Sequence, residues 1–123
     1  MSAQGWHPCP GHIVHVFVQY SDSEGGKCRF PVVVSSAEFN RQNPEVIVAF
    51  ATSSTNVRHP RSYDVEVSER HPEFSMTGLT HGTTIRCGRL WTVNKTKILG
   101  VIGTVPSDLL CDVQRLVVMS FQE

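Results

Sequence analysis

The chain has 123 residues, of which 40% are hydrophobic, and its 11 Lys and Arg side chains balance its 11 Asp and Glu side chains. This length allows one domain, residues 1–123, with a modest hydrophobic core. The balance of charge excludes the strongly basic composition of a typical duplex-DNA binder, and the apolar runs are too short to span a membrane.

The first third of the sequence predicts an irregular arm followed by two strands. Residues 1–10 contain two prolines and no apolar periodicity, so we expect an irregular N-terminal arm. From His12 to Tyr20 both alternating faces are largely apolar, which indicates a central strand. A Ser- and Gly-rich loop follows. The β-branched run 31–34 then predicts a buried strand, and Arg29 lies just before its first residue.

Short strands and polar loops are expected in the middle of the chain. Residues 37–43 predict a polar connection with one helical turn, and residues 46–51 predict a strand that runs into the hydroxyls of Thr52, Ser53 and Ser54. Four later segments are expected to be short strands, the last with a strand–helix mixture as its alternative: 63–67, 83–87, 90–93 and 98–105.

A helix is predicted near the C-terminus. Ser107 is expected to cap it, and Asp108 suits its positive N-terminal end. Apolar residues then recur at helical spacing and give one apolar face, at positions 109, 110, 113, 116 and 117. The elements together predict a curved antiparallel sheet, in the form of a small barrel, with a C-terminal helix.

Arg29 and the hydroxyls that follow residue 51 are the candidate site. A planar guanidinium and neighbouring hydroxyls suit a phosphodiester. The chain between residues 58 and 97 carries seven Lys and Arg against four acidic residues, a local excess that suits a short single strand better than a long duplex. The structural alternatives are an ion pair of Arg29 with Asp22 or Glu24, and hydroxyls that satisfy their own backbone in a turn.

The cysteines and histidines predict no metal centre. The four cysteines form no C-x-x-C pair, which predicts reduced thiols in the cytosol, two of them packed as small hydrophobes. The residues His7, Cys9, His12 and His15 match no standard zinc spacing, so neither a metal nor another cofactor is expected. Three histidines are expected in solvated loops, and one of them can serve as a proton carrier: His59, His71 and His81.

Seven motifs follow one another along the chain: G-H-I-V-x-V-x-V, S-D-S-x-G-x-K-x-R, V-V-V-S-S-x-E-F-N, V-I-V-A-x-x-T-S-S, Y-D-V-E-V, I-R-C-x-R-L-x-T-V and I-G-T-V-x-x-x-L-L. In this order and spacing they resemble the MazF/PemK (Kid) toxins of bacterial type II toxin–antitoxin systems. The resemblance covers residues 11–121.

The resemblance implies a fold, an activity and a set of site residues. The fold is α+β and mainly β: a small SH3-like antiparallel barrel or curved sheet (MazF/CcdB-like) with a C-terminal helix, in a homodimer. The activity is that of a cytoplasmic, metal-independent, sequence-specific endoribonuclease, which cuts single-stranded RNA by attack of a 2′-OH on the adjacent phosphate and is neutralised by a cognate antitoxin. By motif, Arg29 and Thr52 are the implied catalytic residues, and Glu24, Ser53 and Arg86 the implied substrate-binding residues.

Three positions depart from the family pattern. Gly88 stands where one branch has the aspartate of an R-C-D motif, Ser23 stands where some relatives use a loop histidine, and Phe30 separates Arg29 from the following proline. Two alternatives therefore stay open. One is a weakened or non-catalytic nucleic-acid-binding member, and the other is a CcdB-like gyrase-binding toxin, although residues 120–123 hold no tryptophan of the kind that CcdB-like toxins use.

Overall fold

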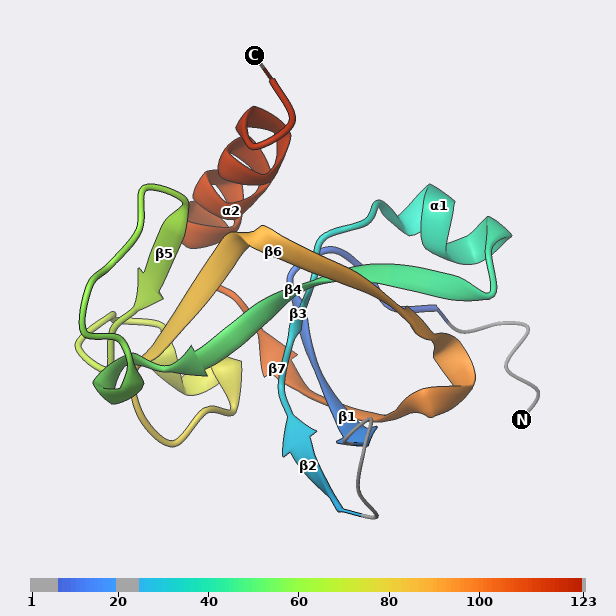
Figure 1. The fold of residues 1–123 in the computed structure, drawn as a ribbon, viewed down its shortest axis with the longest axis horizontal. Coiled ribbons are helices and arrows are strands. Elements are labelled where there is room, and N and C mark those ends of the chain that lie inside the picture. The colour runs from blue at the N-terminus through green and yellow to red at the C-terminus, as the bar shows by residue number, and fades with distance from the viewer. Residues whose placement is uncertain (1–6, 20–24, 123) are drawn as a thin grey trace.

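A computed structural model describes residues 7–19 and 25–122 of the chain. Within these residues the secondary structure is mostly strand, with one short and one longer helix (Figure 1). The strands are β1 (His12–Gln19), β2 (Gly26–Arg29), β3 (Val32–Val33), β4 (Glu45–Ser53), β5 (Asp64–Val67), β6 (Thr83–Asn94) and β7 (Ile98–Thr104). The helices are α1 (Ala37–Gln42) and α2 (Ser107–Met119), with 3-10 turns η2 (Ser54–Asn56), η3 (Phe74–Thr77) and η4 (Lys95–Lys97).

The strands form one curved antiparallel sheet. The path of hydrogen-bonded neighbours is β2-β1-β3-β4-β6-β5. Strand β7 lies off this path and also pairs with β1. Within the described residues no pairing joins β5 to β7, so the sheet is not closed into a barrel. The prediction of a mainly β, curved sheet with a C-terminal helix is confirmed, whereas closure into a barrel is wrong. The reason is that α2, rather than another strand, packs beside β5 and β6 (Figure 1).

Two hydrophobic cores lie on the two faces of the sheet. Because successive residues of a strand point to opposite faces, Ile13 enters one core and Val14 the other, and Val32 and Val33 divide in the same way. This confirms the predicted central strand with two apolar faces from His12 to Gln19, whereas Tyr20, the last residue of the prediction, lies outside the described residues. The predicted apolar face of α2 is also confirmed, because it covers the first core with Val113 at its centre and these partners around it: Leu109, Leu110, Leu116 and Val117.

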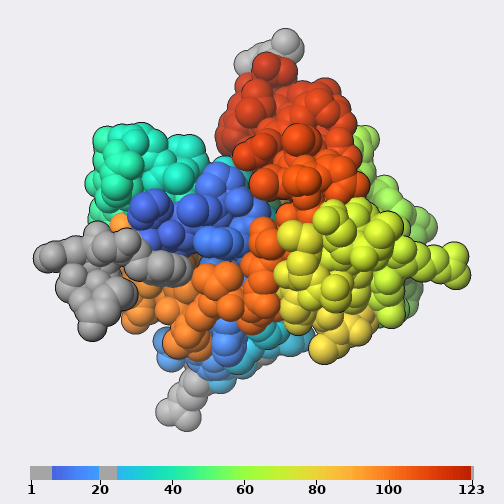
Figure 2. Space-filling view, turned by 180° about the vertical axis from the view of Figure 1, so that it is seen from behind, coloured from blue at the N-terminus to red at the C-terminus, as the bar shows by residue number. Residues whose placement is uncertain are grey.

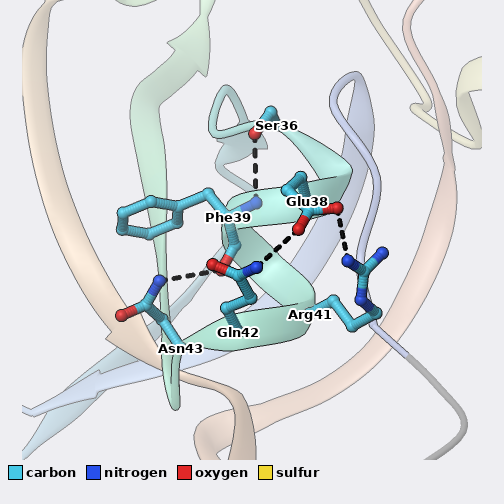
Figure 3. Close-up of polar contacts among 6 residues, drawn as sticks. All are labelled: Ser36, Glu38, Phe39, Arg41, Gln42 and Asn43. Carbon is cyan, nitrogen blue, oxygen red and sulfur yellow. Dashed lines mark hydrogen bonds and ion pairs between the residues drawn. The ribbon is translucent and has the colours of Figure 1, made fainter.

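Helix α1 is longer than the single turn that the sequence predicts. Ser36 caps it by accepting a hydrogen bond from the backbone N–H of Phe39 at 3.1 Å, and Glu38 binds both Arg41 and Gln42 on the exposed side (Figure 3). On the inner side, Asn40 is fully buried. The cap and these side-chain contacts stabilise a six-residue helix where propensity alone favours only a turn.

Two boundaries differ from the sequence-based expectation. The segments 83–87 and 90–93 belong to one strand, β6, whose register to β4 shifts between Ala49 and Phe50. Such a bulge interrupts the alternation, which is why the sequence suggests two strands. At α2 the capping position is held by Pro106 and makes no side-chain hydrogen bond, so the predicted Ser107 cap is wrong. Proline fixes its own φ, and Ser107 is already helical.

The segment around η3 lies against β7 and the start of α2 on the face seen in Figure 2. Gly78 adopts φ +71°, a left-handed conformation that glycine adopts without strain. A Cβ atom on Gly103 of β7 would lie only 2.3 Å from the backbone of Thr77. The close backbone contact between η3 and β7 fixes where the next residues, Leu79 to His81, emerge. None of the described helices is long and apolar enough to cross a membrane.

Candidate functional site

An open groove of about 550 Å³ lies where the ends of β2 and β4 meet the segment that follows η3. Arg29 at the end of β2 and Thr52 and Ser53 at the end of β4 all line it. The remaining lining residues come from the neighbouring parts of the chain: Lys27, Cys28, Phe30, Ala51, Asn56, Gly78, Leu79, Thr80, His81, Thr83 and Ile102. The structure therefore brings three of the predicted site residues into one cavity.

The pairing of the strands brings Arg29 and Thr52 to the same region of the sheet. In the antiparallel pair of β3 and β4, Val32 lies opposite Ala49 and Val33 opposite Val48. Arg29 comes before Val32 and Thr52 comes after Ala49, so in this antiparallel arrangement both residues lie at the same end of the pair. There they line the same groove.

Aromatic contacts orient Arg29. Its Cζ lies 5.7 Å from the ring centroid of Phe50, and Cζ of Arg89 lies 4.5 Å from the same ring. Across the described residues, no carboxylate lies within ion-pair distance of Arg29. A cation held by the face of an aromatic ring keeps its full charge and its hydrogen-bond donors, so none of the described residues neutralises this guanidinium. Asp22 and Glu24, its alternative ion-pair partners, lie outside the described residues.

The hydroxyls at the end of β4 differ in what they contact. Thr52 Oγ1 accepts a long hydrogen bond of 3.5 Å from Asn56 Nδ2, so its own O–H remains a donor. The Ser53 hydroxyl lies 3.0 Å from Thr55 Oγ1. Ser54 turns away from the groove, and its hydroxyl lies 2.9 Å from Thr84 Oγ1. Of the predicted row, Thr52 and Ser53 therefore face the groove.

Of the other two predicted site residues, Arg86 lies outside the groove, and the position of Glu24 is not described. Arg86 lies on β6 with its Nη1 3.4 Å from Asp64 Oδ2, and the two side chains are 13% and 7% exposed. It does not line the groove. Glu24 lies outside the residues that the structure describes.

His81 is a groove residue that the sequence analysis named only as one of three loop histidines able to carry a proton. It is exposed, and its Nδ1 lies 2.9 Å from Thr80 Oγ1. The sequence places His81 in a solvated loop, which is correct. It does not reveal that the contact of η3 with β7 brings this loop to the ends of β2 and β4. Asn56, Lys27 and Cys28 line the groove as well and were not predicted.

The groove is electropositive, and a more acidic recess adjoins it. Among the described residues that line the groove, Lys27 and Arg29 carry charge and none is acidic. The recess, of about 410 Å³, is lined by Glu66, Glu69 and Arg70 together with polar residues, and it shares His81 with the groove. The backbone N–H of Gly82 donates to Glu69 Oε1 at 3.2 Å. His81 thus stands at the junction between the two cavities.

Three groups outside the groove have a pKa that differs from its ordinary value: His12, Cys87 and Asp108. Burial, with a further contribution from the charge of Asp64, raises the pKa of the Cys87 thiol to about 11. A hydrogen bond from His71 lowers the pKa of Asp108 below its usual value. Burial lowers the pKa of His12. Of the two packed cysteines that the sequence predicts, Cys87 is fully buried and Cys9 is partly buried, whereas Cys28 and Cys111 are exposed.

One group of metal-type ligands occurs in the described part of the chain: His71, Glu73 and Asp108. His71 Nδ1 accepts a hydrogen bond from the backbone N–H of Glu73 at 3.0 Å, which leaves Nε2–H to donate to the Asp108 carboxylate at 3.0 Å. A neutral imidazole is fully satisfied by these contacts. The group therefore links the η3 segment to the start of α2 without a metal.

Comparison with known proteins shows which solved structures have a similar fold. No curated protein sequence matches the chain. Among solved structures, an endoribonuclease in complex with its cognate antitoxin from a mycobacterial species superposes with a TM-score of 0.68 at 15% identity, over 92% of this chain and 93% of that one. MazF in a MazE–MazF structure from Deinococcus radiodurans gives a TM-score of 0.69 at 18% identity, over 91% and 94%.

The Mycobacterium tuberculosis toxin MazF-mt6 gives a TM-score of 0.65 at 19% identity, over 91% of this chain and 95% of that one. At these identities the likeness establishes a shared fold. A family profile described as PemK-like, MazF-like toxin of type II toxin-antitoxin system matches residues 10–121. This match confirms the resemblance seen in the sequence, and the chain belongs to the PemK-like, MazF-like toxin family.

Proposed function

We propose that this protein is a metal-independent endoribonuclease toxin that cuts single-stranded RNA at a short sequence. The observation that carries the proposal is the convergence of Arg29, Thr52 and Ser53 on one groove whose described lining has no acidic residue. Family membership and structural neighbours that are endoribonucleases support it. An open, locally basic groove suits a flexible single strand, whose phosphates it can neutralise one or two at a time.

The chemistry needs a cation and a hydrogen-bond donor at one phosphate. The ribose 2′-OH attacks the adjacent phosphorus, the bond to the 5′-oxygen breaks, and the products are a cyclic phosphate and a free 5′-OH. Negative charge builds on the non-bridging oxygens during this step. Arg29 binds these oxygens and stabilises that charge, and Thr52 O–H donates a hydrogen bond to the same phosphate.

Three residues are proposed to bind the rest of the substrate. Ser53 lies in the groove beside Thr52 and can contact the RNA directly. Glu24 is proposed on the family pattern. Arg86 must leave its ion pair with Asp64 before it can reach RNA, so its contact with substrate is the most demanding part of the proposal.

The proposed partners are an antitoxin and a second copy of the chain. Several structural neighbours are complexes with an antitoxin, such as the mycobacterial endoribonuclease and the MazE–MazF structure, which supports an antitoxin partner. The cytoplasm is proposed as the location on the family pattern. Exposed apolar side chains gather on the paired strands β1 and β7, including Phe17 at 53% and Leu99 at 62% exposure. A further group lies at the end of α2, with Met119 and Phe121. Burial of either group in a homodimer would remove apolar surface from water.

Cleavage of RNA in EDTA tests the function. Purified protein is incubated with long single-stranded RNA, and the cleaved ends are mapped by sequencing. We expect discrete cuts, and a loss of about 10²–10³-fold in rate for Arg29→Ala and Thr52→Val. Arg41→Ala removes an exposed arginine of α1 and is the matched control, with an unchanged rate.

Other outcomes of this experiment overturn the proposal. Intact RNA after incubation with the wild-type protein, or unchanged cutting by Arg29→Ala, contradicts an endoribonuclease of this type. RNA that is bound and not cut identifies a non-catalytic binding member. Gyrase-dependent DNA breaks with untouched RNA identify a CcdB-like toxin.

A further inference from the structure

The groove contains a proton acceptor that the family motif does not assign, and that the sequence offers only as one of three loop histidines. Cleavage by a 2′-OH requires a group that takes the hydroxyl proton. Arg29 cannot do this at neutral pH because a guanidinium stays protonated, and a threonine hydroxyl is a poor base. The positions from which some relatives supply a carboxylate or a histidine are Gly88 and Ser23 in this chain.

Of the titratable residues that line the described groove, His81 is the one suited to proton transfer at neutral pH. The others are Lys27, Cys28 and Arg29. Ammonium, guanidinium and thiol groups hold their protons at neutral pH, whereas imidazole is the side chain that both takes up and releases a proton there. Chemistry and position in the cavity thus select the same residue.

The contacts of His81 orient its ring for this task. Nδ1 lies 2.9 Å from Thr80 Oγ1, so an Nδ1–H that donates to this hydroxyl leaves Nε2 with a free lone pair. Glu69, on the recess side, holds the next residue through the hydrogen bond from the Gly82 backbone N–H. The backbone on both sides of His81 is therefore fixed, by this bond on one side and by the contact of η3 with β7 on the other.

We infer that His81 is the general base of the proposed RNA cleavage, and that its Nε2 accepts the proton of the attacking 2′-OH. This inference rests on the function proposed above. As O2′ forms its bond to phosphorus, its proton passes to Nε2. The bond between phosphorus and O5′ then breaks, and O5′ takes a proton from a water molecule of the open groove. The imidazolium returns its proton to the hydroxide that remains, which restores the neutral ring.

Charged groups on both sides of His81 bear on its titration. Lys27 and Arg29 face it from the groove, together with the Cys28 thiol. Glu66, Glu69 and Arg70 face it from the recess. Bound RNA adds phosphates to the groove, and these favour the protonated imidazole. The pH profile is therefore best measured as kcat/KM, which reports the free enzyme.

The test is the pH dependence of cleavage by His81 variants in the full chain. A short fluorescent RNA that contains one mapped cut site is the substrate, between pH 5 and pH 9. For the wild type, kcat/KM should fall tenfold per pH unit along an acid limb, because a protonated imidazole cannot accept the 2′-OH proton. His81→Asn and His81→Gln should lower kcat/KM by about 10²–10⁴-fold and abolish this acid limb, and added imidazole should restore part of the rate. His59→Asn changes an exposed loop histidine and is the matched control.

Each result separates the inference from the function on which it rests. Wild-type cleavage whose acid limb persists unchanged in His81→Asn refutes the inference and leaves the endoribonuclease intact. An acid limb that moves with Cys28→Ser instead assigns the base to the thiol and refutes His81. Absence of wild-type cleavage at every pH refutes the proposed function itself. RNA affinity of His81→Asn within about twofold of wild type, together with the lost acid limb, supports proton transfer rather than a contact for binding.

Discussion

Arg86 and Asp64 face each other across β5 and β6, where they are register partners and their side chains are almost buried. Arg86 Nη1 lies 3.4 Å from the Asp64 carboxylate and has no hydrogen-bond partner in the described part of the chain. The carboxylate also accepts a hydrogen bond from the backbone N–H of Arg61 at 2.8 Å. Asp64 thus compensates a buried cation and also fixes the turn before β5.

The first prediction concerns this ion pair. Asp64→Ala leaves the Arg86 charge nearly buried and unpaired, so we expect a loss of about 3–5 kcal/mol in the free energy of unfolding. The double variant Asp64→Asn with Arg86→Met removes both charges and keeps most of the packing, so it should cost much less, whereas Arg86→Met alone leaves the nearly buried Asp64 carboxylate unpaired. Urea unfolding compares Asp64→Ala with the double variant. An equal loss in the free energy of unfolding for the two variants would show that the lost attraction within the pair, rather than the uncompensated charge, causes the loss. Full cleavage by Arg86→Met would remove Arg86 from the proposed substrate contacts.

A second prediction follows from the raised pKa of Cys87. Its ordinary pKa is 9.0 and its folded pKa is about 11, so the buried thiol favours the folded state fully below pH 9. This stabilisation is lost as the pH rises from 9 to 11, because the unfolded chain ionises first. The loss is of the order of 2–3 kcal/mol.

Thiol modification and unfolding measurements check this expectation. At pH 8 a thiol reagent should modify the exposed Cys28 and Cys111 quickly and Cys87 only after unfolding. Cys87→Ala should have a smaller fall in unfolding free energy between pH 9 and pH 11 than the wild type. Rapid modification of Cys87 in the native protein would contradict its burial.

The third prediction is that Asn40 holds α1 and the residues before β1 together. Its Nδ2 donates to Pro8 O at 2.7 Å and to Ser35 O at 3.1 Å, and the side chain is fully buried. Asn40→Ala leaves these acceptors without a partner, so we expect a loss of about 2–4 kcal/mol. Gln42→Ala, on the exposed side of the same helix, should change stability by less than about 0.5 kcal/mol. Similar losses for both variants would contradict the anchoring role.

A fourth prediction tests the contact that positions His81. A Cβ atom on Gly103 would lie 2.3 Å from the Thr77 backbone, whereas a Cβ atom on Gly100 of the same strand meets nothing within 4 Å. Gly103→Ala should therefore displace the η3 segment, lower the melting temperature and reduce cleavage. Gly100→Ala should leave both unchanged. Normal cleavage by Gly103→Ala would show that His81 does not depend on this contact.

Much of the fold could be predicted because local sequence patterns specify which faces are buried. The alternation of apolar residues from His12 onward and the helical spacing of the apolar residues after Asp108 require particular faces to be buried, and both predictions are confirmed. The bulge between β4 and β6 and the open edge of the sheet could not be predicted. They depend on the bending of the long strands and on the element that covers β5, and no local sequence pattern specifies these two features.

The amino-acid sequence by itself determined the strand and helix periodicity, the family, and the proposal that Arg29 and Thr52 act together. Both residues line one groove. The two apolar faces of the sheet fix its register, because a one-residue slip would turn the buried apolar side chains of a strand to the opposite face. Only the tertiary structure decided that His81 shares their groove and that Arg86 pairs with Asp64. Those contacts join segments far apart in the chain. They arise from the packing of backbone against backbone at Gly103 and from cross-strand pairing, which no stretch of sequence specifies alone.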